Sequence, residues 1–417
     1  MKKLLFLSLL SFSQISISSE TIISLDQVAA KVKESNFSVL ENAQRVYQAK
    51  ETINFSKRNL LPRLNFWNIL KLPIDWASAI DIVQDLAPFL VPNNWFRVSQ
   101  SNLFYLAQKE QYRALWANQV MTAKLLYINT LRDADFLNLL KIQKEQLQEL
   151  VDIAETRVIF GDIPPQVVKF LKIRNLEVSE DIRSLENLVY EEVKSLSFLM
   201  GIPQEDKVLL ESIDLPNVDE LEPISFDTFI FRALDNAPEI NQYDYIKEAL
   251  NHTRKEVYFS FLGSSSTARG ISGGTFDNVP IQDGLGFGLG SSLRISRSEK
   301  EILDINQKAT SEVIKKSLYV LVNSFNSYVE NIDNQNNRFE LAKDNHQIIK
   351  TQLALGMNLD PIEMLESIQN LFDASVSLVN YKYDVVTTME KVKRTIFNED
   401  YSKIEGKLES VLRGANL

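Results

Sequence analysis

Two glutamates, Glu363 and Glu366, are the residues of this chain whose type and spacing most directly suggest chemistry. They lie in the stretch LALGMNLDPIEMLE, just beyond a glycine and a proline that separate two helical sequence patterns. Residues three positions apart are neighbours on a helix, so the two carboxylates share one helix face. Taken alone, the pair is typical of a solvated face near a helix start, where the helix dipole favours acidic side chains.

The rest of the sequence offers little material for catalysis. It contains no cysteine and only two histidines, His252 and His346, which are far apart in the chain. Disulfides and thiolate sites are therefore excluded, and a histidine metal site or a Ser-His-Asp triad is disfavoured. The formal net charge of −10 argues against nucleic acid as a partner. We expect a protein that is not an enzyme and that holds no cofactor and no metal ion.

Residues 1–18 have the pattern of a secretory signal peptide. Two lysines follow the first methionine, the run Leu4–Phe12 is apolar, and Ser16 and Ser18 supply the small residues of a cleavage site. This apolar run is too short to span a bilayer, and no later run approaches the roughly 20 residues that a spanning helix needs. The sequence therefore predicts an exported protein.

The mature chain reads as two copies of one unit, which are weakly similar in identities but alike in pattern. Residues 28–62 align with 228–262, and Gly161 aligns with Gly356 in the later part of each copy. We place one large domain at 19–417.

This domain divides into four parts. The first repeat spans 21–205 and the second 223–397. An acidic, proline-containing linker joins them at 206–222, and a C-terminal tail follows at 398–417.

Each copy has the same predicted element order. Two shorter helices lead to a non-helical hairpin of about 33 residues, then a very long helix, a glycine-marked turn and a second long helix. The first long helix runs from about Trp95 to Phe160, and the returning helices cover about 164–200 and 360–397. Their apolar residues recur at spacings of three and four between polar residues, which is the pattern of a coiled-coil seam. The fold class is therefore mostly α, built from long antiparallel helical hairpins.

The second hairpin contains a segment whose sequence predicts a membrane-spanning β-strand. Glycine and serine alternate with five apolar residues, and this period-two pattern is typical of a strand with one apolar face. The five are Leu285, Phe287, Leu289, Leu293 and Ile295. A hairpin in a bilayer must close into a barrel, because its edges would otherwise be unsatisfied. We expect hairpins from other copies of the chain to complete that barrel.

These features together resemble the TolC-like outer-membrane efflux protein family, also called outer membrane factors. The resemblance rests on the signal peptide, the two tandem copies, LLPRL before the first hairpin, and FGDIPP and LGMNLD at the two turns, and it covers about 21–397. It implies a homotrimer whose long helices form an α-barrel across the periplasm, continued by a shared 12-stranded β-barrel with four strands per chain. It also implies outer-membrane localisation and export of small molecules or proteins, including type I secretion, with a periplasmic adaptor (membrane fusion protein) and an inner-membrane pump.

The resemblance also assigns roles to the two turns. Glu363 and Glu366 match acidic residues that line the narrow periplasmic aperture of the tunnel, if NLDP holds one extra residue. The tips that meet the adaptor match the residues Phe160, Gly161, Leu355 and Gly356. The arginine and tyrosine that lock the aperture in the best-known member have no evident counterparts.

The first hairpin departs from the family pattern. It alternates poorly, and Pro73, Pro88 and Pro92 would interrupt strands. Two hypotheses therefore stay open: a trimeric export channel-tunnel, or a periplasmic coiled-coil structural protein of this family with a degenerate barrel and no open pore.

Overall fold

The computed structural model describes residues 20–61, 87–215, 221–260, 279, 281, 287–354 and 360–402. The predicted signal peptide, most of both hairpins, the turn residues Leu355 and Gly356, and the tail beyond residue 402 lie outside the described residues.

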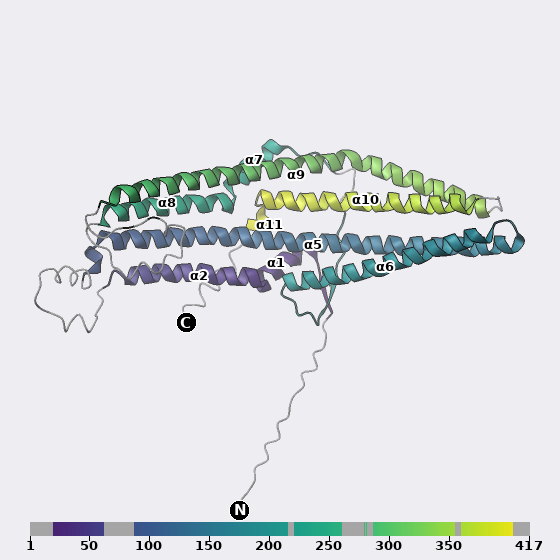
Figure 1. Ribbon diagram of the computed structural model, residues 1–417, viewed down its shortest axis with the longest axis horizontal. Coiled ribbons are helices and arrows are strands. Elements are labelled where there is room, and N and C mark those ends of the chain that lie inside the picture. The colour runs from purple at the N-terminus through teal and green to yellow at the C-terminus, as the bar shows by residue number, and fades with distance from the viewer. Residues whose placement is uncertain are drawn as a thin grey trace, which may run out of the picture.

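The described chain is dominated by long helices (Figure 1). The first half contains β1 (Glu20–Ile23), α1 (Leu25–Ser35), α2 (Phe37–Arg58), the 3-10 helix η1 (Pro88–Leu90), α5 (Pro92–Phe160), α6 (Pro165–Leu199) and β2 (Lys207–Leu210). The second half contains α7 (Phe226–Asp235), α8 (Pro238–Tyr258), α9 (Leu289–Ala354), α10 (Pro361–Thr395) and α11 (Glu399–Ser402). With 69 residues, α5 is about 100 Å long.

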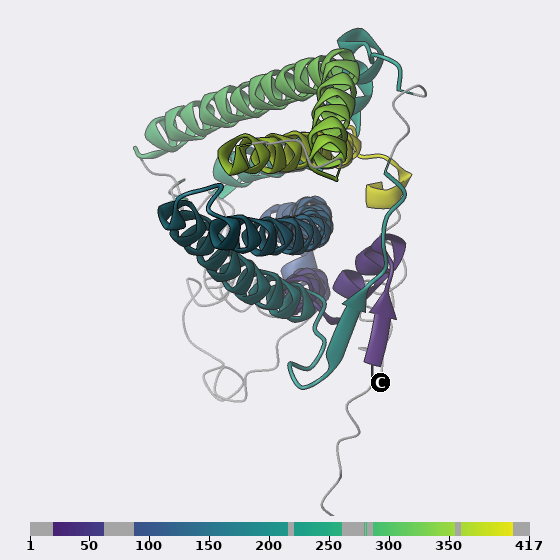
Figure 2. The same cartoon turned by 90° about the vertical axis from the view of Figure 1, so that its right-hand side faces the viewer.

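The long helices lie side by side in one layer. Helix α5 packs along α2 and α6 on one side and along α8 and α10 on the other, and α9 packs on the outer side of α8 and α10. The layer therefore has two open edges, one formed by α2 and α6 and the other by α9, as the end-on view of Figure 2 shows.

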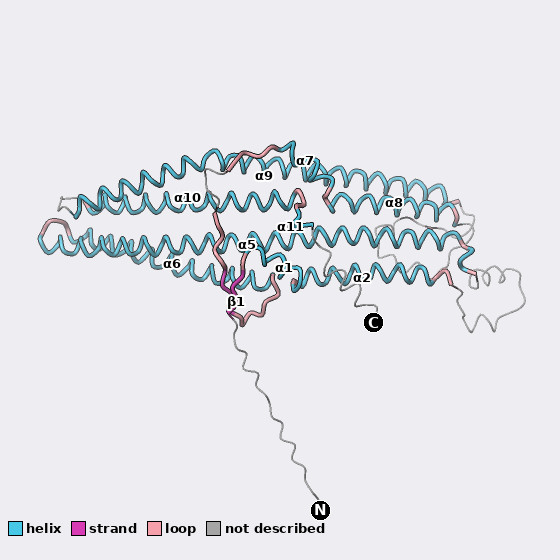
Figure 3. The backbone as a smooth tube through the Cα atoms, turned by 180° about the vertical axis from the view of Figure 1, so that it is seen from behind, coloured by secondary structure: helices cyan, strands magenta, loops and turns pink. Residues whose placement is uncertain are grey.

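The two strands and the short helices α1, α7 and α11 gather near mid-length (Figure 1), on one side of this layer (Figure 2). Strands β1 and β2, coloured magenta in Figure 3, pair in parallel, with Thr21 opposite Val208 and Ile23 opposite Leu210. The predicted linker thus contributes a strand, β2, that returns to the start of the chain. A core cluster below this sheet joins α1, α2, α5 and the end of α6.

Proline and glycine set the ends of the long helices. Pro165 and Pro361 stand in the first turns of α6 and α10, where a missing N–H costs nothing. Gly161 ends α5 in the left-handed conformation, at φ 81°, which glycine adopts without steric cost. The side chain of Asp360 caps α10 by accepting a hydrogen bond from the backbone N–H of Ile362 at 2.9 Å.

The strand predicted around 285–295 is wrong from Leu289 onward, because α9 begins there. Leu289, Leu293 and Ile295 are helical, and Ser292 and Ser296 are buried on one face of the helix. Small serines on the buried face of a helix produce the same alternation of small and apolar letters that a strand would show. In the first hairpin, likewise, residues 88–90 form a 3-10 turn and α5 already starts at residue 92.

Among the described residues, no helix carries an 18-residue stretch that is apolar enough to cross a bilayer.

Candidate functional site

The turn between α5 and α6 forms a tip with exposed apolar side chains. Ile159 is 83% exposed and Phe160 75%. The turn that presents them is well defined, since Gly161 donates to the Val158 carbonyl at 3.0 Å and Asp162 donates to that of Arg157 at 2.9 Å. Of the predicted adaptor-contact residues, Phe160 and Gly161 thus lie at a hydrogen-bonded turn on an exposed tip, whereas Leu355 and Gly356 lie outside the described residues.

Glu363 and Glu366 lie on the exposed face of the first turns of α10. The opposite face buries Met364 and Ile368 in a cluster with α5 and α6. Neither glutamate makes an ion pair or a hydrogen bond with the described residues. The structure therefore brings the two carboxylates onto one open helix face next to the tip, free to interact with solvent, ions or another chain.

A polar junction just beyond these glutamates ties the two helical hairpins together. The side-chain oxygen of Gln369 in α10 accepts hydrogen bonds from Gln143 of α5 and Arg174 of α6, each at 3.1 Å. Its amide nitrogen donates to Asp373 at 2.9 Å. Sequence reasoning missed this junction, because isolated amides leave no periodic signal.

The two histidines lie in different parts of the molecule. His346 of α9 is 7% exposed, and its Nδ1 lies 2.8 Å from the Ser367 hydroxyl of α10. Burial lowers the pKa of His346, the positive charge of Lys350 adds to this, and Glu149 opposes it. His252 belongs to α8, which packs far from the tips (Figure 1). In the part of the chain that the structure describes, no group of three or more His, Cys, Asp or Glu residues could hold a metal ion.

A buried ion pair joins the two halves of the chain at mid-length. Lys124 of α5 and Glu390 of α10 lie 3.1 Å apart, and each side chain is 5% exposed. The other Glu390 oxygen accepts from Lys393 at 2.7 Å, and the buried hydroxyl of Tyr401 in α11 donates to Glu390 at 3.1 Å. In the sequence, Lys124 stands among apolar residues of α5. This apolar context is the signal from which a buried lysine could have been predicted.

A second titratable group lies between α5 and α6. The pKa of Glu192 is raised to about 7, mainly by burial and then by the negative charge of Asp133, while the positive charge of Arg132 partly opposes the shift. Its Oε2 atom is buried without a hydrogen-bond partner among the described residues.

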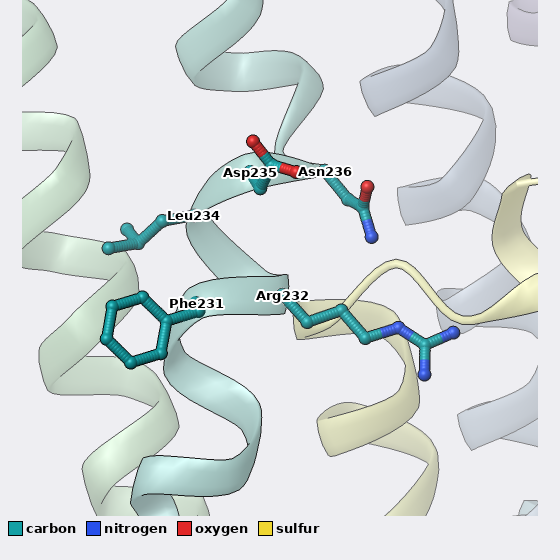
Figure 4. A pocket seen from close by; sticks show the side chains of 5 residues that line it. All are labelled: Phe231, Arg232, Leu234, Asp235 and Asn236. Atoms are coloured by element: carbon teal, nitrogen blue, oxygen red, sulfur yellow. The ribbon is translucent and has the colours of Figure 1, made fainter.

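An open hollow of about 580 Å³ lies at the turn from α7 to α8. Figure 4 shows its lining residues, with Phe231 and Leu234 directed toward one side and Arg232 toward the other. Arg232 donates to Asn398 at 3.4 Å. The side chain of Phe231 is 79% exposed, so the hollow is part of an outer surface and not an enclosed binding site.

No family model and no curated protein matches this chain in sequence. Solved structures of outer membrane channels do match it along nearly its whole length. The Campylobacter jejuni CmeC outer membrane channel is 15% identical, with a TM-score of 0.68 over 93% of this chain and 89% of that chain. The outer-membrane channel OprN is 11% identical, with a TM-score of 0.70 over 90% of each chain.

The Vibrio cholerae outer membrane protein VceC is 11% identical, with a TM-score of 0.69 over 90% of this chain and 96% of that one. The chain therefore has the TolC-like outer membrane factor fold, as the sequence resemblance predicted.

Proposed function

We propose that this protein is a trimeric outer-membrane channel-tunnel that exports small molecules or proteins across the periplasm. Its partners would be two further copies of the chain, a periplasmic adaptor and an inner-membrane pump. The fold that it shares with outer membrane channels supports this proposal. The single observation that carries it is the chemistry of the two open edges of the helical layer.

Both edge helices leave an apolar row in solvent, opposite the face that each one buries. Helix α6 buries Leu171, Val178 and Ile182 against α5. Its exposed row contains Phe170, Ile173, Leu176, Leu188, Tyr190 and Phe198. The exposed row of α9 contains Ile302, Ile305, Val313, Val320, Leu341 and Ile348.

Apolar rows of this length on a coiled-coil helix call for a partner helix. Because the two edges differ, contact between copies is heterologous, and a heterologous contact closes into a ring when its rotation allows. A closed ring of such layers would be a helical tunnel. The first tip, with Ile159 and Phe160, would then project at its end and offer an apolar surface to an adaptor.

The glutamate pair would lie at the mouth of this tunnel. Symmetry would repeat Glu363 and Glu366 around the axis, and rings of carboxylates select cations and bind divalent ions. We expect Glu363→Gln with Glu366→Gln to weaken both cation selectivity and block by divalent cations. A matched control is Asp227→Asn, which also removes an acidic side chain from a first helical turn, but in α7 at mid-length.

The experiment starts with fractionation of cells that express the full chain. Heat-resistant trimers in outer membranes support the proposal, whereas soluble monomers favour the alternative of a periplasmic structural protein without an open pore. Purified trimers are then measured as single channels in planar bilayers. If the double variant and the Asp227 control have the same selectivity as the unmodified protein, the role of the glutamate pair is refuted.

A further inference from the structure

Two exposed phenylalanines form a pair where α2 meets the end of α6. Phe37, the first residue of α2, is 63% exposed, and Phe198, in the last turn of α6, is 58% exposed. Their ring centroids lie 5.8 Å apart, a separation at which aromatic rings attract each other. The pair is part of the edge formed by α2 and α6.

The backbone that carries this pair is held firmly. Asn36 accepts a hydrogen bond from the Val39 N–H at 3.1 Å and donates to the Leu199 carbonyl at 2.8 Å, so it joins the two helix ends. Just beyond, Gly201 has φ +64°, and a Cβ there would lie 2.4 Å from the carbonyl oxygen of Ser35. The two helix ends are therefore held in a fixed relation, and within one copy of the chain both rings remain exposed to solvent.

The opposite edge carries a second aromatic patch. Phe231 of α7 is 79% exposed, and Tyr319 and Val320 of α9 are 56% and 53% exposed. Helix α7 is fixed on α9, where Phe226 packs edge-to-face against Tyr319 with centroids 5.7 Å apart. The open hollow at the end of α7 lies directly beside Phe231 (Figure 4).

Both patches lie at the same height along the molecule. Ile396, at the end of α10, belongs to the core cluster under α7 and α9. The next residue, Phe397, belongs to the cluster that contains Leu196 and Met200 at the end of α6. Adjacent residues thus join the cores behind the two patches, which places the patches level with each other on opposite edges.

We infer that the Phe37–Phe198 pair of one copy packs against the patch of Phe231, Tyr319 and Val320 on the next copy. The inference rests on the proposed ring of copies and specifies where they meet at mid-height. Phe198 ends the exposed row of α6 and Val320 belongs to that of α9, so the contact continues the edges along which the copies would already be joined. Two level, complementary patches on unlike edges are what a heterologous ring contact requires.

The direct test replaces Phe231 with the photoreactive analogue benzoyl-phenylalanine in the full chain in outer membranes. After irradiation, we expect a covalent dimer of the chain, and peptide mapping should place the link within 36–40 or 196–202. A link to a different protein, a link to another segment of the chain, or trimers without any link would each overturn the inference.

A second measurement tests the energetics of the contact. Phe37→Ser with Phe198→Ser should lower the fraction of heat-resistant trimers at least about tenfold, because buried aromatic anchors dominate interface energies. The control is Tyr258→Ser, which alters an aromatic residue that is 51% exposed on the inner helix α8. Equal loss in both variants, or unchanged trimers in the double variant, contradicts the contact.

The two tests separate this inference from the proposed function. Conducting trimers without the Phe231 link overturn the contact alone. Linked trimers that do not conduct overturn the export channel and leave the contact intact.

Discussion

Replacing Lys124 with methionine should destabilise the protein strongly, although methionine fits the buried site in size. The substitution leaves the Glu390 carboxylate buried, and among the described residues it keeps Lys393 and Tyr401 as hydrogen-bond partners. Breaking a buried ion pair by removing one partner typically costs 3–5 kcal/mol. Lys393 is 35% exposed and still compensates part of the charge, so we expect a loss of about 3 kcal/mol in the free energy of unfolding.

The assay is urea unfolding of the full chain in detergent, followed by circular dichroism at pH 7 and at one fixed protein concentration. A fixed concentration is needed because assembly contributes to apparent stability. The double variant Lys124→Met with Glu390→Leu removes both charges and should recover most of the loss. A loss below about 1 kcal/mol for Lys124→Met, or no recovery in the double variant, would refute this account of the site.

The pH dependence gives a second check of the same site. Burial raises the pKa of Glu390, but Lys124 and then Lys393 more than offset this, and the net pKa lies below its ordinary value. A lowered carboxyl pKa contributes stability above the unfolded pKa of about 4.5 and loses it as the pH falls. A protonated Glu390 needs no cation. The difference in free energy of unfolding between the unmodified protein and Lys124→Met should therefore become smaller as the pH falls below about 4.5. An equal difference at pH 7 and pH 4 would contradict the assignment.

Three further substitutions test other parts of the structure. The pKa of Glu192 is raised to about 7, so the folded state keeps a proton that the unfolded state loses from about pH 4.5, and stability should fall as the pH rises through this window. Glu192→Gln should remove that decline in Tm between pH 5 and 8. If Tm declines equally in the variant and in the unmodified protein, Glu192 is not the group that causes it. Gly161→Ala should lower the free energy of unfolding by about 1 kcal/mol because its backbone is left-handed. The loss should be no larger, because a Cβ at this position meets open space. Gly201→Ala should cost a further 1–3 kcal/mol because of its clash with Ser35, and equal Tm values for the two alanine variants would contradict that packing.

The sequence was sufficient for the long helices because their seam repeats over many turns and their ends carry local signals. These local signals are Pro165, Pro361 and Gly161. Each acts within one turn of backbone, so the helix ends that they mark can be predicted from a single sequence. The strand prediction was wrong from Leu289 to Ile295 because buried serines in a helix and glycines in a strand give the same alternation of small and apolar residues. Local periodicity cannot separate these cases, since the difference depends on which helix packs opposite.

The buried polar contacts could not be predicted for a different reason. Lys124 and Glu390 are separated by 266 positions, and Gln369 meets Gln143 across 226. Each is a single polar residue with no repeating partner, and only the packing of α10 against α5 brings them together. The acidic pair, in contrast, could be placed on one helix face from spacing alone, and its role remains a prediction.

The described residues beside the two turns differ in chemistry, although the two halves of the chain share one element order. The first presents exposed Ile159 and Phe160, whereas the second begins α10 with exposed Glu363 and Glu366. An apolar tip gains free energy when a protein surface covers it, but an acidic helix face pays to be desolvated unless a cation or a basic group meets it. If copies form a ring, the apolar pair Ile159 and Phe160 and the acidic pair Glu363 and Glu366 would alternate around its end. Substitution of Glu363 and Glu366 should then change ion selection while leaving partner docking at Ile159 and Phe160 intact.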